Sequence, residues 1–146
     1  MDPKVLTLIS SALVIIVCAG AALLSIKTCA PALASVTSEK PDLGSKLLIT
    51  IILGEALAIY GLLIAFMIIA RLDEITTEYE AVQTFVAAIT MSSTATIASL
   101  GISWCGPAMM TAAVENPRSF TTNILGLVLS EALAIYGLLI SFMLIG

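Results

Sequence analysis

GEALAIYGLLIAFMI (residues 54–68) and SEALAIYGLLISFML (residues 130–144) are two copies of one apolar segment. They agree at 12 of 15 positions and lie 76 residues apart. Each contains one glutamate, Glu55 or Glu131, which is the only charged residue of an apolar run long enough to cross a bilayer. Placing a charged carboxylate in hydrocarbon costs about 3 kcal/mol or more, so an intramembrane glutamate indicates a functional site. The same costly residue at two matching positions strengthens that interpretation.

The composition predicts an all-α integral membrane protein. Of the 146 residues, 60% are hydrophobic and 11% are charged, and the mean hydropathy of +1.13 lies outside the range of soluble domains. Roughly 20 apolar residues cross the hydrocarbon core as a helix. Four stretches meet this requirement, at about 5–26, 47–70, 81–110 and 120–146. The first is longer than a typical signal-peptide core, so we expect it to remain as a transmembrane helix.

The 76-residue repeat extends beyond the glutamates and divides the chain into two helical hairpins, at 1–76 and 77–146. Further residues recur at this offset without a gap: Cys29 with Cys105, Pro31 with Pro107, Glu39 with Glu115, Pro41 with Pro117, and Tyr60 with Tyr136. Two crossings return the chain to its starting side, so the hairpins are parallel repeats related by an axis along the membrane normal. Both glutamates then lie at one depth, about 21 Å of helix beyond the loop prolines. Such a unit can be continued around a ring.

The loops give a predicted orientation. Loops one and three hold Lys27, Lys40, Lys46 and Arg118, whereas the acidic second loop (71–80) has only Arg71. The positive-inside rule places loops one and three in the cytoplasm, and both termini on the lumenal or external side. No basic patch suggests binding to nucleic acid.

Small residues dominate the first and third helices, where Ala, Ser and Gly recur, while the second and fourth are rich in Leu and Ile. Small residues allow close helix approach in lipid. We therefore expect the first and third helices to lie inside and the other two outside, although an ordinary four-helix bundle predicts the same residues. The three cysteines, Cys18, Cys29 and Cys105, are interpreted as packing residues. The chain has no histidine, which excludes a histidine proton relay and a zinc site with histidine ligands.

A carboxyl group that faces lipid is held neutral, because desolvation disfavours its charge, and it ionises beside a cation or a water-filled channel. This alternation is what a proton carrier requires. The alternative is a structural glutamate that is hydrogen-bonded to hold helices together.

The E-A-L-A-I-Y-G-L pattern, the two hairpins, the loop prolines and the carboxylate of the second helix resemble the proteolipid (c or K) subunit of rotary ATPases. The double hairpin resembles the vacuolar and archaeal/bacterial V/A-type branch, and the likeness covers nearly the whole chain. It implies that the chains assemble into a c-ring and that Glu55 and Glu131 bind the transported ion, with Tyr60 and Tyr136 near the sites. Packing in the membrane core is the alternative role for the tyrosines. The usual eukaryotic vacuolar subunit keeps only the second carboxylate, whereas this chain keeps both.

The ligand set favours protons over sodium. Sodium sites of the family add an inner-helix glutamine and a hydroxyl beside the glutamate. Here the only glutamine, Gln83, lies at the acidic loop, and alanines (Ala56 and Ala132) follow the glutamates. Hydroxyl residues on the inner helices that could contribute are Ser25, Thr28, Thr96, Ser99 and Ser103. We interpret them more simply as packing residues.

The sequence thus predicts a rotor-ring proteolipid of a V/A-type ATPase that carries protons, with no catalytic site, metal or cofactor of its own. No Walker-type G-x-x-x-x-G-K-[ST] motif is present, so ATP chemistry would belong to partner subunits. The resemblance implies a homo- or hetero-oligomeric ring, a stator subunit with an arginine, and a cytoplasmic central stalk. The expected membrane is vacuolar or another endomembrane in a eukaryote and the plasma membrane in a prokaryote. The alternatives are a small proton-coupled antiporter and a structural proteolipid.

Overall fold

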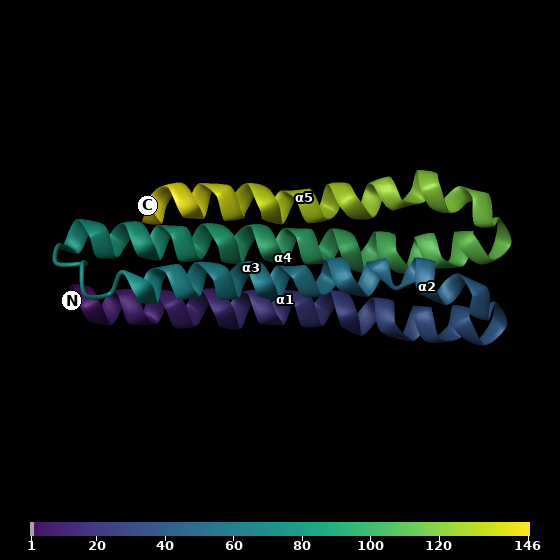
Figure 1. Ribbon diagram of the computed structural model, residues 1–146, viewed down its shortest axis with the longest axis horizontal. Coiled ribbons are helices and arrows are strands. Elements are labelled where there is room, and N and C mark those ends of the chain that lie inside the picture. The colour runs from purple at the N-terminus through teal and green to yellow at the C-terminus, as the bar shows by residue number, and fades with distance from the viewer. Residues whose placement is uncertain (1) are drawn as a thin grey trace.

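The computed structural model describes residues 2–146, and this part of the chain forms an elongated bundle of long helices without strands (Figure 1). The main helices are α1 (Pro3–Glu39), α3 (Ile49–Ala70), α4 (Glu78–Glu115) and α5 (Phe120–Ile145). Short helical turns precede α3 and α5, namely η1 (Pro41–Leu43), α2 (Gly44–Leu47) and η2 (Pro117–Ser119). Four helical segments are long and apolar enough to cross a membrane. The predicted all-α architecture with two tandem hairpins is confirmed.

The first helix of each hairpin is longer than we expected. We predicted ends near residues 26 and 110, but α1 continues to Glu39 and α4 to Glu115, with Pro31 and Pro107 inside them. A proline removes one intrahelical hydrogen bond, and neighbouring helices in a bundle can tolerate that loss. Lys27 therefore lies in α1 and not in the first loop, so the predicted placement of one of the basic residues behind the orientation is wrong. The orientation itself stays a prediction.

The loop prolines do end these helices. Lys40 and Asn116 precede Pro41 and Pro117 and have φ/ψ of −134°/81° and −141°/97°, which are not helical. A proline disfavours the α conformation of the residue before it, because its ring collides with that residue's backbone. The chain then turns sharply through η1 or η2 into the second helix.

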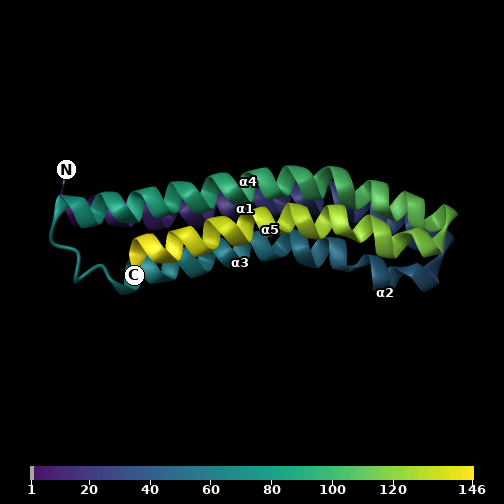
Figure 2. The same cartoon turned by 90° about the horizontal axis from the view of Figure 1, so that it is seen from above.

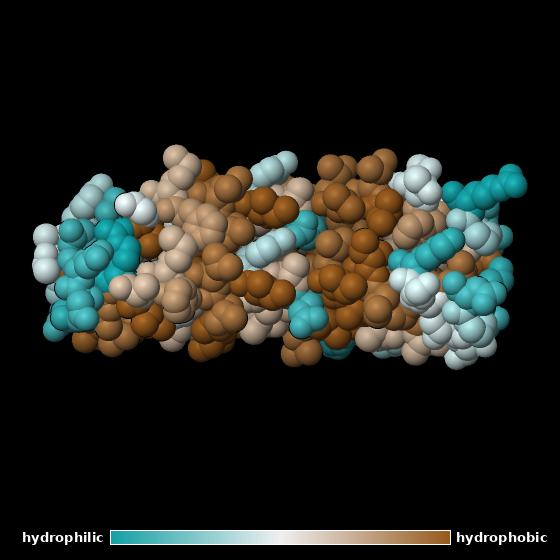
Figure 3. Space-filling view, viewed as in Figure 1, coloured by the Kyte–Doolittle hydropathy of each residue, from teal (hydrophilic) through white to brown (hydrophobic). Residues whose placement is uncertain are grey.

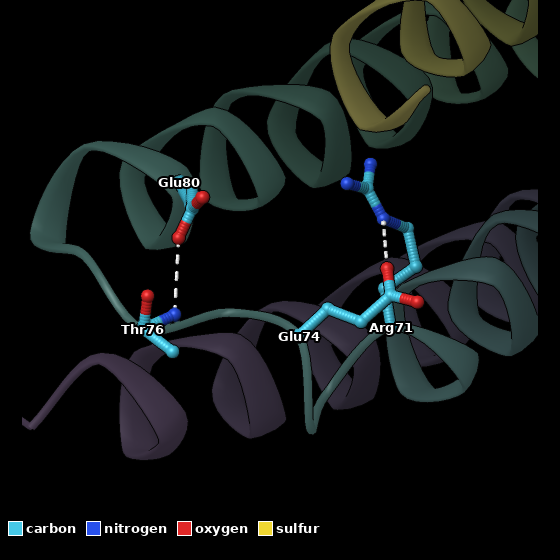
Figure 4. Close-up of polar contacts among 4 residues, drawn as sticks. All are labelled: Arg71, Glu74, Thr76 and Glu80. Carbon is cyan, nitrogen blue, oxygen red and sulfur yellow. Dashed lines mark hydrogen bonds and ion pairs between the residues drawn. The ribbon is translucent and has the colours of Figure 1, made fainter.

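The second loop is closed by hydrogen bonds and an ion pair of its acidic residues (Figure 4). The Glu80 carboxylate accepts from the backbone N–H groups of Thr76 and Thr77, each at 3.0 Å, and the Thr77 hydroxyl accepts from the N–H of Glu80. This capping box satisfies donors that the first turn of α4 leaves free. Arg71 pairs with Glu74 at 3.2 Å.

Thr77→Ala should loosen this helix start, because it removes the acceptor that binds the N–H of Glu80. Loss of an N-cap costs about 1 kcal/mol, or roughly a fivefold faster hydrogen exchange of the first-turn amides. Thr76→Ala is the matched control, since Thr76 contributes only its backbone N–H to the box. Equal exchange in the two variants would contradict the capping role.

The helices form two layers (Figure 2). α1 and α4 pack together as one layer, α3 packs on α1, and α5 packs on α4, while α3 and α5 contact each other less. The contact between α1 and α4 is made by small residues. The Ser25 hydroxyl donates to the carbonyl of Ser99 at 3.4 Å, and that of Ser103 donates to the carbonyl of Leu24 at 3.3 Å. The small-residue helices therefore lie side by side within one chain, as the predicted inner layer requires.

Each hairpin is held by a close approach between a serine and a glycine. In the first hairpin Gly54 of α3 lies against Ser25 of α1, and in the second Ser130 of α5 lies against Gly101 of α4. These positions are repeat equivalents with the two residue types exchanged. A Cβ at Gly54 would lie 2.8 Å from the Cβ of Ser25, too close for any ordinary contact.

Gly54→Ser should therefore destabilise the first hairpin by about 1–3 kcal/mol, the usual cost of overpacking. Adding Ser25→Gly should restore most of the loss, because the second hairpin already has that arrangement. Thermal unfolding in detergent measures the three variants. A double variant no more stable than Gly54→Ser alone would show that the contact does not govern the packing.

The surface has the pattern of a membrane protein. Figure 3 shows hydrophilic residues at both ends of the molecule and a broad hydrophobic belt between them, interrupted by a few hydrophilic patches. This belt covers the lengths of the four candidate spans.

Candidate ion-binding site

The two repeated glutamates lie on equivalent helices but in different surroundings. Glu55 is on α3 and Glu131 on α5, each 14 residues after its loop proline. Glu131 is only 6% exposed in the single chain, whereas Glu55 is exposed. Neither glutamate forms a salt bridge with a lysine or arginine within residues 2–146. The repeat in sequence is therefore not a repeat in environment, as far as one chain is concerned.

Glu131 is completed by a residue of the other hairpin. The Tyr60 hydroxyl, on α3, donates a hydrogen bond to Oε1 of Glu131. A tyrosine donor stabilises a carboxylate without a full counter-charge, so the carboxyl group can still take up and release a proton. The site thus lies between α3 and α5, and both hairpins contribute to it.

Tyr60 does not pair with the glutamate of its own helix. Five residues along an α-helix amount to a rotation of about 500°, so Tyr60 and Glu55 point in directions about 140° apart. Glu55 consequently lies on the side of α3 away from Tyr60. The sequence contained this signal in the five-residue spacing, which favours a partner on a neighbouring helix.

The equivalent pair, Glu55 and Tyr136, is not brought together within one chain. Tyr136 is 60% exposed, and no hydrogen bond joins its hydroxyl or the Glu55 carboxylate to another residue of the described chain. The structure therefore unites Tyr60 with Glu131 and leaves the other two predicted site residues without each other.

The hydroxyl residues considered as sodium ligands mostly bind backbone carbonyls. Thr28 donates to Ser25, Thr96 to Ser92, and Ser103 to Leu24, at 2.8–3.3 Å. Such back-bonding occupies the hydroxyl proton and fits a packing role. Ser99 is the exception, because its buried hydroxyl has no partner among the described residues. No group of three or more His, Cys, Asp or Glu side chains within residues 2–146 has the arrangement of a metal site.

The comparison with known families decides the identity. The family of the ATP synthase C subunit matches this chain twice, over residues 9–68 and 85–144. The chain belongs to the ATP synthase C-subunit family. The two matches correspond to the two hairpins, and each contains one of the repeated glutamates. The resemblance to the proteolipids of rotary ATPases, expected from the sequence, is confirmed.

Individual relatives carry the name of one branch of this family. The chain is 32% identical over 108 residues to the 16 kDa proteolipid c-subunit of the V-type proton ATPase of Nephrops norvegicus, covering 72% of this chain and 67% of that protein. It is 29% identical over 112 residues to the protein of the same name from Rattus norvegicus, covering 77% and 72%. The V-type proton ATPase proteolipid subunit of Dictyostelium discoideum is 31% identical over 108 residues, which are 72% of this chain and 55% of that protein.

Proposed function

We propose that this multi-pass membrane protein is a proteolipid of the rotor ring of a V-type rotary ATPase, and that it carries protons on Glu55 and Glu131. The observation that carries the proposal is the buried Glu131, which accepts a hydrogen bond from the Tyr60 hydroxyl in the middle of a membrane-spanning helix. Family membership and the names of the relatives support the rotor role.

The proposed chemistry uses the two charge states of the carboxyl group. Protonated and neutral, Glu131 can face lipid at little cost, and ionised it is stabilised by a donor or a nearby cation. A stator arginine that each glutamate passes would favour release of the proton, and the next turn of the ring would return the carboxyl group to lipid. A membrane potential of 100 mV supplies about 2.3 kcal/mol for each charge moved across it, so several sites in a turn can couple to ATP chemistry.

The partners follow from this role. The ring would contain several proteolipid copies, a stator subunit would supply the arginine, and a central stalk would contact the loops that contain Pro41 and Pro117. ATP binding and hydrolysis or synthesis would belong to other subunits. Proton transport fits the ligands around Glu131 better than sodium transport, because the hydroxyls of Thr96 and Ser103 are already bound to carbonyls.

The rotor role is tested by purifying the protein from its native membrane. We expect a large annular oligomer that co-purifies with nucleotide-binding ATPase subunits, and ATP-driven acidification of vesicles reconstituted with the complex. A monomer or dimer that transports a substrate without those subunits would overturn the rotor role in favour of an antiporter.

A further inference from the structure

The repeat leaves matching surfaces unused at the two edges of the chain. On α4, residues that pack toward the first hairpin are buried, but their equivalents on α1 are exposed. The pairs are Ala88 with Ala12, Ala95 with Ala19, Ser99 with Leu23, and Gly106 with Ala30. Ala88, Ala95 and Ser99 are 0% exposed, and Leu23 is 64% exposed. The first hairpin therefore has an open edge where the second hairpin has a covered one.

The opposite edge shows the converse. Ile64 and Ile68 of α3 are fully buried in the chain, and Tyr60 beside them is half-buried. Their equivalents on α5 are Ile140, which is 48% exposed, Leu144, which is half-buried, and Tyr136. The face that α3 offers to the second hairpin is thus repeated on α5 with nothing against it.

An apolar groove lies on the open edge of the first hairpin, between α1 and α3. Its lining includes Ala12, Ile15, Phe66 and Ile69. In the second hairpin the equivalent positions are closed by the first hairpin. Ile145 is 1% exposed where Ile69 is 53% exposed, and Phe142 is half-buried where Phe66 is 70% exposed.

We infer that a second copy of this chain occupies this edge, with its α4 and α5 packed against α1 and α3, and that it supplies Tyr136 to Glu55. The known contact between the two hairpins, moved along by one repeat, gives this arrangement directly. Tyr60 of one hairpin binds Glu131 of the next, so Tyr136 binds the glutamate of the hairpin after that, which is Glu55 of the neighbouring copy. The inference rests on the ring assembly of the proposed function.

The two carboxylates then differ in when their sites are completed. Glu131 has its tyrosine partner in a single folded chain, whereas Glu55 acquires one only when two copies join. A ring of this protein would contain both kinds of junction in alternation, one inside each chain and one between chains. An unassembled chain would have one complete site and one open site.

Cysteine cross-linking tests the junction between copies. Within the chain, a Cβ placed at Gly106 would lie 2.5 Å from the Sγ of Cys29. One repeat further, Cys105 of one copy should lie opposite Ala30 of its neighbour. Such proximity suits a disulfide, which needs Cβ atoms about 4 Å apart. The experiment uses Ala30→Cys in a chain with Cys18→Ala and Cys29→Ala, assembled in the complete complex and oxidised with copper phenanthroline.

We expect a ladder of covalent multimers from these rings. The control adds Cys105→Ala, which should give monomers only. A complex of normal mass that forms no ladder would overturn the inference and leave the edge to lipid or another subunit. If the cysteine variant does not assemble, benzoylphenylalanine in place of Tyr136 provides the second test. Photo-cross-links to a peptide of α3 from another copy are expected, and cross-links confined to lipid or to the same chain would contradict the arrangement.

The contact with Glu55 has its own readout, carbodiimide labelling of protonated carboxyl groups. In assembled rings, Tyr136→Phe should change the pH dependence of labelling at Glu55 and leave Glu131 unaffected. A ladder without this change would retain the interface and overturn the role of Tyr136. Vesicle acidification is scored separately, so rings that cross-link but transport no protons would refute the proposed function and not the junction.

Discussion

Replacing Glu131 with glutamine is expected to abolish proton transport while leaving the ring assembled. Glutamine keeps the shape of the side chain and accepts a hydrogen bond from Tyr60, but it cannot bind and release a proton at neutral pH. We expect ATP-driven acidification to fall by more than about tenfold, since one inactive site in each chain interrupts every turn of the rotor. Glu55→Gln should have an effect of the same kind if both carboxylates carry protons.

Glu115→Gln is the matched control, because Glu115 lies at the end of α4 near the loop and away from the membrane centre. It should transport protons at nearly the normal rate. The mass of the complex shows whether each variant assembles. Normal acidification by Glu131→Gln rings would contradict the carrier role and support a glutamate that only holds helices together. Loss of activity in Glu131→Gln alone would assign transport to one carboxylate per chain.

Removing the hydroxyl of Tyr60 is expected to change the behaviour of Glu131 and not that of Glu55. The hydroxyl donates to Oε1 of Glu131, so it favours the ionised carboxylate. A hydrogen bond to a charged group contributes about 1.5–3 kcal/mol, and about 1.36 kcal/mol corresponds to one pH unit. In Tyr60→Phe, Glu131 should stay protonated to a higher pH, and its half-maximal carbodiimide labelling should move upward by about one unit.

The pattern of labelling separates the two possible tyrosine pairings. A shift at Glu131 with none at Glu55 supports the contact between hairpins that the structure contains. A shift at Glu55 alone would instead support a pairing within one helix. Phenylalanine retains the ring of Tyr60, so packing between α3 and α5 changes little in this variant.

The duplication made most of the fold predictable. Four apolar runs at two equal spacings allow only two parallel hairpins, and the loop prolines end α1 and α4 as expected. The helix lengths were less predictable, because Pro31 and Pro107 resemble helix breakers when each is considered in isolation. Packing of α1 against α3 and α4 carries the helix through a missing hydrogen bond, and no local pattern reveals such tertiary support.

The candidate site was predictable in its residues but not in its pairing. Glu131 stood out because a carboxylate is costly in an apolar run, which is a property of one residue and its flanks. The partnership of Tyr60 with Glu131 depends on how two helices of different hairpins face each other. Only the rotation of five residues along α3 hinted at it. The unequal burial of Glu55 and Glu131 could not be seen in two nearly identical segments, because it comes from the edge of the chain.

The most direct test of the carrier role is residue-resolved carbodiimide labelling of the intact complex across pH, with and without sodium, read by mass spectrometry. Carbodiimides react with protonated carboxyl groups in apolar surroundings. We predict selective labelling of Glu55 and Glu131 near neutral pH, unaffected by sodium, and inhibition of acidification in step with the label. Protection by sodium would contradict the assignment of protons. Failure of both glutamates to react would contradict the proposal that they carry the transported ion.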